Sequence, residues 1–198
     1  MAGPDKQARR PAALLLTGGG SRRMGRDKAT LVIAGDRLAD RTAALLRPVA
    51  HPVIEVGPGY TSLSRTRENP PGSGPLAALA AGAGALRALH HGGPVLVVAT
   101  DLPRLTAAYL QLLVDHRVPH PDHCVVPRDA GGRAQPLCAR YSLAALACAE
   151  DLFATGERAM KALLQRVAVT WLDPDPSDVL FDIDTPEDLG PIDRAKLR

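Results

Sequence analysis

Aromatic side chains are scarce in this sequence of 198 residues, in which two Phe, three Tyr and one Trp amount to 3%. A core must therefore be built from Leu, Val and Ala, which suit helices and short buried strands. The charge bias is also weak, at +3 with an isoelectric point near 9.0. Because no basic stripe is interleaved with aromatic residues, we expect no nucleic-acid partner. A small polyanionic ligand explains the basic excess equally well.

Cysteines and long apolar runs are few as well. Cys124, Cys138 and Cys148 show no CxxC spacing and no cluster with His, which argues against a disulfide scaffold or a structural zinc site. No run approaches the length of a membrane span, and the polar start of the chain is unlike a secretory signal. We therefore expect a cytoplasmic protein with no membrane partner, whose cysteines are small buried hydrophobic residues.

The length suits one domain, and we expect a disordered tail over residues 1–10 followed by a single domain over 11–198. Short apolar runs alternate with stretches of helical spacing. This pattern predicts an α/β fold of three layers, α/β/α, around a mostly parallel sheet. Strands are expected at 12–17, 52–56, 95–99, 124–127, 137–141, 167–172 and 179–183, a loop at 61–74, and helices at 36–47, 75–90, 106–117, 142–151, 157–166 and from 185.

The most informative motif begins in the last residues of the first expected strand, continues as a glycine-rich loop, and reads LLTGGGSRRMGRDKATL, ending at Leu31. Glycines let a backbone turn sharply and direct N–H groups at an anion. Arg22, Arg23 and Lys28 add positive charge that can spread over a triphosphate. We interpret the motif as a phosphate-binding loop at the carboxyl end of a strand, where open α/β sheets place their ligands.

Two familiar phosphate motifs do not fit this loop. A P-loop requires Lys-Ser/Thr after its last Gly, but Arg26 and Asp27 follow Gly25. The dinucleotide fingerprint GxGxxG fails because Arg23 stands at the position of its third Gly. A plain glycine-rich turn with solvated arginines is the simpler alternative, and the three cations at this spacing argue against it.

Acidic residues follow two later strands. Asp101 comes after the apolar run Val95–Ala99 and Thr100, and Asp182 and Asp184 alternate along the expected strand end at 179–183. Mg²⁺ binds one or two carboxylates together with phosphate oxygens, so Asp101 and Asp184 are the candidate metal ligands. The competing interpretation of Asp101 is a turn residue before Pro103, and Thr185-Pro186 is also an ordinary helix start.

Two weaker features complete the candidate site. The segment Gly72–Leu76 precedes a helix whose N-terminus suits a base or a phosphate, although a flexible loop explains it equally well. Gln135 and Pro136 suit an acceptor pocket, and a simple hairpin is the alternative.

Taken together, these residues resemble the MobA-type molybdenum cofactor guanylyltransferase family. The matching pieces are LLTGGGSRRMGRDKATL, GPLAAL, TDLPRL, QPLCARY and DIDTPEDL, in the family's order from about residue 12 to 189. The resemblance implies a Rossmann-like nucleotidyltransferase fold that uses GTP and Mg²⁺. It also implies molybdopterin as acceptor, release of pyrophosphate, and contacts with proteins that mature molybdoenzymes.

The motifs and the resemblance together give expected roles to single residues. Lys28, Arg22, Arg23 and Asp101 are expected to be catalytic, Asp101 and Asp184 to hold the metal, and Gln135 and Pro136 to contact the acceptor. The expected nucleotide-binding residues are Leu16, Thr17, Gly18, Gly19, Gly20, Ser21, Lys28, Glu68, Gly74, Pro75, Leu76 and Asp101. Glu68 lies near the position of a family Asp that faces the guanine edge.

The chain also departs from the family pattern. Thr17 stands where the family usually has Ala, and Asp182 and Asp184 stand where guanylyl enzymes often have Asn. The acidic pair resembles related cytidylyltransferases, so CTP remains an alternative donor. The same residues also fit another small-molecule phosphate nucleotidyltransferase and, less well, a non-catalytic nucleotide-binding regulator.

Overall fold

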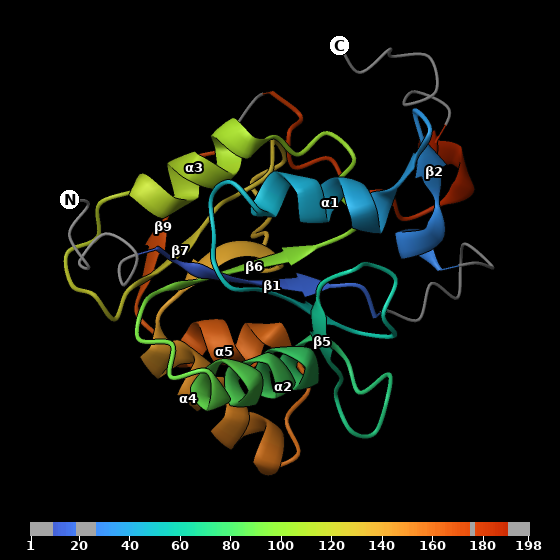
Figure 1. Cartoon of the computed structure of the whole chain (residues 1–198). Helices are drawn as coiled ribbons and strands as arrows, with labels where there is room; N and C mark the ends of the chain where they lie inside the picture. Colours follow the sequence, from blue (N-terminus) through green and yellow to red (C-terminus); the bar gives the residue numbers. More distant parts are fainter. Residues whose placement is uncertain (1–9, 19–26, 175–176, 190–198) are drawn as a thin grey trace, which may run out of the picture.

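The computed structural model describes residues 10–18, 27–174 and 177–189, and its centre is a seven-stranded sheet (Figure 1). Its strands stand in the order β5-β4-β1-β6-β8-β7-β9. Their bounds are β1 Ala12–Leu16, β4 Val53–Val56, β5 Ser64–Thr66, β6 Val95–Ala99, β7 Cys124–Val126, β8 Cys138–Tyr141 and β9 Val169–Trp171. Within this sheet β8 runs against its neighbours, because β6 and β7 both pair with it antiparallel, and the remaining pairs are parallel.

The order of the strands reverses at β1, which pairs with β4 on one side and with β6 on the other. All residues of β1 and β6 are buried, as expected for central strands covered on both faces. Leu16 and Ala99 are partners in the register, so these two strands end at the same level. A crevice outside the carboxyl ends of such strands is where α/β sheets of this kind bind ligands.

Helices cover both faces of the sheet and complete the three layers (Figure 1). Helices α1 (Leu38–Leu46) and α3 (Ala107–Asp115) lie on one face. Helices α2 (Pro75–Ala88), α4 (Leu143–Ala154) and α5 (Met160–Arg166) lie on the other. Thr106 caps α3 and Ser142 caps α4, each by accepting a hydrogen bond from a backbone N–H in the first turn.

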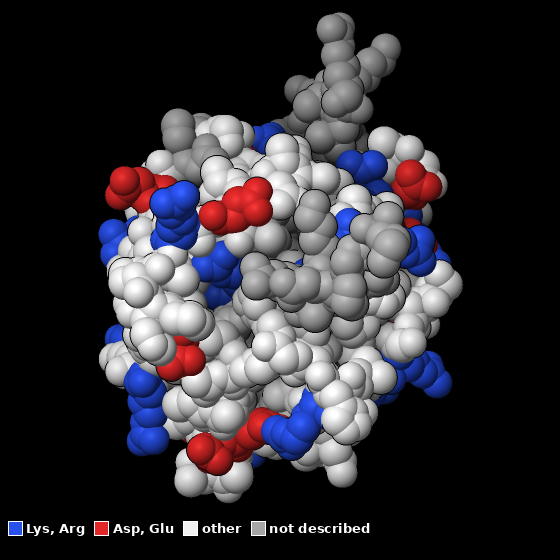
Figure 2. Space-filling model, turned by 60° about the vertical axis from the view of Figure 1, so that its left-hand side comes forward, with Lys and Arg blue, Asp and Glu red and all other residues white. Residues whose placement is uncertain are grey.

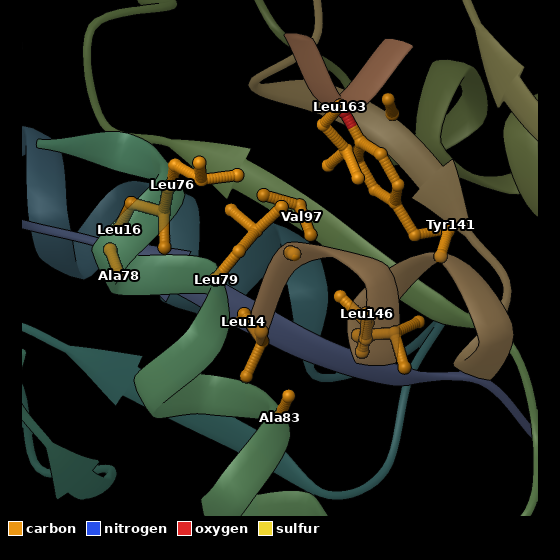
Figure 3. Close-up of a cluster of buried hydrophobic side chains, with 14 of the residues drawn as sticks. Leu14, Leu16, Leu76, Ala78, Leu79, Ala83, Val97, Tyr141, Leu146 and Leu163 are labelled. Atoms are coloured by element: carbon orange, nitrogen blue, oxygen red, sulfur yellow. The ribbon is translucent and has the colours of Figure 1, made fainter. Parts of the chain in front are cut away.

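Alternate residues of the central strands supply two separate cores. Leu14 and Leu16 of β1 pack against α2, while Ala13 and Leu15 face the layer of α1 and α3. Figure 3 shows the first core, where Leu76 and Leu79 of α2 meet Leu14, Val97 and the α4 residue Leu146. The cores contain mainly Leu, Val and Ala, as the shortage of aromatic residues predicts.

Most of the expected elements are present, and a few differ. The expected strand at 179–183 is wrong, because the structure gives these residues no strand. Instead Val179 and Leu180 lie in a turn closed by the hydrogen bond from Phe181 to Asp178, and irregular backbone follows, with Val179, Leu180 and Ile183 buried. The expected loop at 61–74 contains the edge strand β5. The helix expected from residue 36 begins at Leu38, because Asp36–Arg37 forms β3 and pairs with β2 (Val32–Ile33). The expected tail over residues 1–10 lies, except for Arg10, outside the described residues.

Positive and negative side chains are scattered over the face in Figure 2 rather than gathered by sign. No helix in the described part of the chain is long and apolar enough to cross a membrane. Cys124 and Cys138 are buried, as expected, and Cys148 is half-buried; all three are free thiols.

Candidate active site

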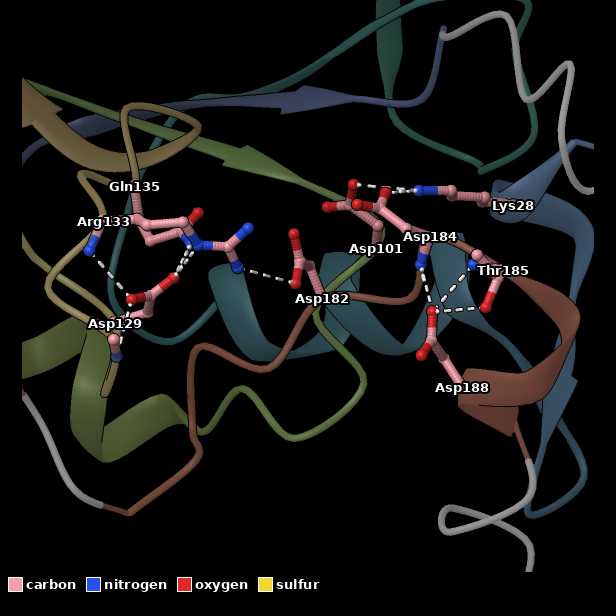
Figure 4. Close-up of polar contacts among 10 residues, drawn as sticks. Lys28, Asp101, Asp129, Arg133, Gln135, Asp182, Asp184, Thr185 and Asp188 are labelled. Atoms are coloured by element: carbon pink, nitrogen blue, oxygen red, sulfur yellow. Dashed lines mark hydrogen bonds and ion pairs between the residues drawn. The ribbon is translucent and has the colours of Figure 1, made fainter.

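The candidate site lies where β1 and β6 end. Thr17 and Gly18 follow β1, and Thr100 and Asp101 follow β6. The backbone N–H of Ile183 donates to the carbonyl oxygen of Asp101 at 2.9 Å, and this contact holds the segment around Ile183 beside the end of β6. Asp182 and Asp184 flank Ile183. The carboxylates of Asp101, Asp182 and Asp184, from two distant parts of the chain, therefore gather at the carboxyl ends of the central strands (Figure 4).

Lys28 reaches these carboxylates from one side. Its Nζ lies 2.8 Å from Oδ1 of Asp184 and 3.6 Å from Oδ2 of Asp101. Lys28 opens the short 3₁₀ helix η1 (Lys28–Thr30), which is capped by the Asp27 side chain through a hydrogen bond from the N–H of Ala29. The structure therefore brings Lys28, Asp101 and Asp184, which the sequence places far apart, into direct contact.

The environment of Asp101 is unfavourable to its own charge. Burial raises the pKa of Asp101, the positive charge of Lys28 partly offsets this, and the charges of Asp182 and Asp184 raise the pKa further. The Asp101 side chain keeps 30% of its surface exposed. A carboxylate in this position gains from a second cation, which is the situation of a metal ligand.

The segment that carries Asp184 is fixed by its own short hydrogen-bond network. Oδ2 of Asp188, in the final 3₁₀ helix η2 (Pro186–Leu189), accepts from the N–H groups of Asp184 and Thr185 and from the Thr185 hydroxyl. The two backbone bonds are the main reason that the pKa of Asp188 is lowered. Within the described residues, the helix expected from residue 185 is thus the 3₁₀ helix η2, whose acid orients the backbone of a candidate metal ligand.

Arg133 approaches the same carboxylates from the opposite side (Figure 4). Its Nε lies 2.8 Å from Oδ2 of Asp129 and its Nη2 lies 3.6 Å from Oδ1 of Asp182. Asp129 also accepts from the N–H groups of Gly131 and Arg133 and from the Gln135 amide. Although burial alone would raise the pKa of Asp129, these hydrogen bonds outweigh it and the pKa is lowered.

A pocket of about 180 Å³ opens beside Arg133. Its lining consists of Asp129, Ala130, Gly131, Arg133, Asp178, Leu180, Phe181 and Asp182. Arg104 stacks over the Phe181 ring at 4.7 Å and pairs with Asp178 at 3.0 Å, which stiffens one wall. The carboxylates therefore have Lys28 on one side and, on the other, a pocket whose lining combines the Arg133 guanidinium with acidic and apolar side chains.

Glu68 lies on the other side of the end of β1. It is 7% exposed, its Oε1 accepts from the N–H of Gly72 at 2.9 Å, and its Oε2 has no hydrogen-bond partner within the described residues. A Cβ added to Gly18 would lie 3.6 Å from Oε1, so the carboxylate is next to the start of the glycine motif. A buried, unsatisfied oxygen is costly and marks a position where a ligand donor fits.

The other expected site residues differ in what they offer a ligand. The Leu16 and Leu76 side chains are buried in the core, so only their backbones remain available. Gly74 and Pro75 are half-buried at the N-terminus of α2. Gln135 is held by Asp129, and the Pro136 carbonyl accepts from Tyr141. The remaining ones, Gly19, Gly20, Ser21, Arg22 and Arg23, lie outside the described residues.

Arg133 and Asp129 are site residues that the sequence did not predict. The Asp-Ala-Gly-Gly-Arg stretch indicates a turn, but nothing in it shows that its arginine faces residues near position 182. Glu55 was not predicted either, although it carried a signal: it is an acid inside the otherwise apolar strand β4 and is fully buried.

The comparison with known families gives one clear match. The model described as "MobA-like NTP transferase domain" matches residues 13–170. Among curated relatives, a protein named "Probable molybdenum cofactor guanylyltransferase" from Chloroflexus aggregans is 30% identical over 90% of this chain and 91% of its own length. Proteins of the same name from Mycobacterium marinum (32% identical; 96% of each chain) and Opitutus terrae (38%; 76% and 75%) match as well.

Solved structures share the fold. Molybdopterin-guanine dinucleotide biosynthesis protein A from Archaeoglobus fulgidus superposes with a TM-score of 0.73 at 22% identity, over 92% of this chain and 96% of that one. The 2-C-methyl-D-erythritol 4-phosphate cytidylyltransferase from Thermus thermophilus gives a TM-score of 0.64 at 17% identity, over 92% and 97%. Together with the family match, these likenesses confirm the Rossmann-like nucleotidyltransferase fold, and the chain belongs to the MobA-like NTP transferase family.

Proposed function

We propose that the chain is a molybdenum cofactor guanylyltransferase, which transfers GMP from GTP to the phosphate of molybdopterin and releases pyrophosphate. The observation that carries the proposal is the contact of Lys28 with Asp101 and Asp184 at the carboxyl ends of the central strands. The names of the curated relatives support the same activity.

The position of Glu68 favours guanine as the base of the nucleotide donor. The guanine edge presents two neighbouring N–H donors, whereas the corresponding edge of cytosine presents only one. The unpaired Oε2 of Glu68, together with Oε1, can accept from both donors of guanine. We therefore assign the base to the space beside Gly18 and Glu68, and we prefer GTP to CTP.

The carboxylates fit Mg²⁺. The described residues offer Asp101 and Asp184 rather than a closed set of three or more ligands. This open set suits an ion whose remaining ligands are water and substrate phosphate oxygens. When bound, Mg²⁺ would neutralise charge that develops on the phosphate being transferred.

The chemistry needs no covalent bond to the protein. A phosphate oxygen of the acceptor forms a bond with the α-phosphorus of GTP, the bond to the β-phosphate oxygen breaks, and pyrophosphate leaves with that electron pair. Lys28, from the nucleotide side, stabilises the negative charge on the phosphates. Arg133, from the opposite side, holds the acceptor phosphate in line. Catalysis is then a matter of positioning and charge stabilisation.

The pocket beside Arg133 is our candidate acceptor site. Its cation suits the acceptor phosphate, and Leu180 and Phe181 suit the flat face of a pterin ring. Gln135, which Asp129 fixes, lies within the same hydrogen-bond network (Figure 4). Gln135 and its neighbour Pro136 therefore stay assigned to acceptor binding.

Asp101→Asn tests the proposed function. The change keeps the side-chain shape and removes the charge, so we expect pyrophosphate release from GTP and molybdopterin to fall by at least about 100-fold. Asp151→Asn, on the exposed side of α4, is the matched control and should retain full activity. Near-normal turnover of Asp101→Asn would exclude the proposal.

The choice of donor is tested with the four nucleoside triphosphates. In thermal unfolding with Mg²⁺, a ligand at 100 times its dissociation constant adds about 2.7 kcal/mol of stability. GTP should raise the melting temperature most. A larger effect of CTP would favour the cytidylyltransferase alternative, which the acidic Asp182 and Asp184 keep open.

A further inference from the structure

Glu55 of β4 forms a dense hydrogen-bond network in the interior. Its side chain is fully buried and accepts from the Thr17 and Thr61 hydroxyls and from the N–H groups of Gly59, Tyr60 and Thr61. Burial by itself would raise the pKa of Glu55, but these hydrogen bonds outweigh it and the pKa is lowered. A fully satisfied buried carboxylate of this kind fixes the backbone around it.

The turn that Glu55 fixes reaches the lysine of the candidate site through Tyr60. The Tyr60 hydroxyl donates to Oδ2 of Asp27 at 2.8 Å, and Oδ1 of the same carboxylate accepts from Ala29 at the start of η1. The Asp27 backbone carbonyl accepts from the Thr30 hydroxyl. Asp27 is therefore held at both oxygens and at its backbone, and the next residue is Lys28.

The same turn also touches the end of β1. A Cβ added to Gly57 would overlap the Thr17 hydroxyl and lie 2.8 Å from the N–H nitrogen of Gly18. Thr17 itself donates to Glu55 at 2.6 Å. In the sequence, Thr17 and Asp27 flank the part of the motif that is rich in glycine and arginine, and one short turn after β4 contacts both of them.

We infer that Tyr60 is a positioning residue of the proposed reaction: anchored by Glu55, its hydroxyl holds Asp27 and so sets where Lys28 meets the phosphates and carboxylates. The inference rests on the proposed function of Lys28. It predicts that Tyr60 acts on nucleotide binding only through Lys28. A residue that merely stabilises the fold would have an effect that does not depend on Lys28.

A double-mutant cycle tests this directly. The affinity for GTP with Mg²⁺ is measured by calorimetry for wild type, Tyr60→Phe, Lys28→Ala and the double variant. Losing one charge-assisted hydrogen bond that orders Lys28 should weaken GTP binding roughly tenfold in the wild-type background. In the Lys28→Ala background the same change should weaken it less than about twofold, because coupled residues are not additive.

Tyr141→Phe is the matched control. It removes a phenol hydroxyl that donates to the Pro136 carbonyl at 2.9 Å, in a fully buried tyrosine outside the Glu55 network. The control should lower the free energy of unfolding and leave GTP affinity within about twofold of wild type. Tyr60→Phe should show the opposite pattern, since its ring is half-buried and stays in place.

The outcomes separate the two proposals. If Tyr60→Phe weakens GTP binding equally in both backgrounds, or does not weaken it, the positioning role is overturned while the proposed function stands. If Lys28→Ala binds GTP as tightly as wild type and Asp101→Asn also turns over normally, the proposed function is wrong. The inference about Tyr60 is then wrong as well, because it rests on the function of Lys28.

Discussion

Replacing Glu68 with Gln should separate guanine recognition from the rest of nucleotide binding. The Gln carbonyl can keep the hydrogen bond from Gly72, and the amide nitrogen then replaces the buried, unpartnered Oε2. That nitrogen is a donor and would face a donor of guanine. The change thus removes one charge-assisted hydrogen bond and leaves two donors opposed.

The expected magnitude follows from those contacts. A hydrogen bond to a charged group contributes about 1.5–3 kcal/mol, and the opposed donors add to the loss, so we expect GTP affinity to fall by about 3 kcal/mol, or roughly 150-fold. The protein without nucleotide should be no less stable than wild type, because Glu68→Gln removes a buried charged oxygen that has no partner in the described structure.

Calorimetry with GTP and inosine triphosphate checks this reasoning, since the second nucleotide lacks the exocyclic amine of guanine. Wild type should bind inosine triphosphate about tenfold more weakly than GTP, whereas Glu68→Gln should distinguish the two much less. Glu150→Gln, which affects a surface pair with Arg87 between α2 and α4, is the control. The reasoning is refuted if Glu68→Gln binds GTP within about twofold of wild type.

Two further predictions concern Arg133 and Glu55. Arg133→Met should raise the KM for the acceptor by about tenfold or more and leave the KM for GTP unchanged, as measured by pyrophosphate release, because the guanidinium lines the pocket proposed for the acceptor. A rise in the KM for GTP alone would contradict the assignment. Glu55→Gln should lower the free energy of unfolding by about 3 kcal/mol near pH 7, since one oxygen with its two hydrogen bonds is lost. Because the folded-state pKa of Glu55 lies below the unfolded value of about 4.3, its stabilisation is present above that pH and is lost as the pH falls through the folded pKa. Urea unfolding from about pH 7 to 3.5 should therefore show a shallower pH dependence for Glu55→Gln, and parallel curves for the two proteins would argue against the network.

The central part of the fold could be predicted because its strands carry a strong local signal. β1 and β6 are apolar at every position, as strands covered on both faces must be, and the glycine motif marks the end of β1. β5 carries no such signal, because Ser64–Thr66 is a polar edge strand with exposed residues. Residues 179–183 carry a misleading strand signal. Their apolar side chains fill space beside the sheet, but their backbone does not pair with it.

The candidate site could be predicted only in part, for a related reason. Lys28, Asp101 and Asp184 stand at recognisable motifs, but the contact between them depends on one backbone hydrogen bond, from Ile183 to Asp101, and on the cap of η1. Arg133 belongs to no recognisable motif, because its position depends on the hydrogen bonds that its backbone and guanidinium donate to Asp129. Long-range contacts of this kind leave no periodicity in the sequence.

The hydrogen bond from Ile183 to Asp101 also has a consequence for synthesis of the protein. A nascent chain that has emerged only as far as residue 174 already contains every strand of the seven-stranded sheet and Lys28, yet it lacks both Asp182 and Asp184. Such a chain has the scaffold of a nucleotide-binding protein without its full set of acids. In the proposed reaction, Asp182 and Asp184 therefore join the site only after every strand of the sheet that positions it has been made.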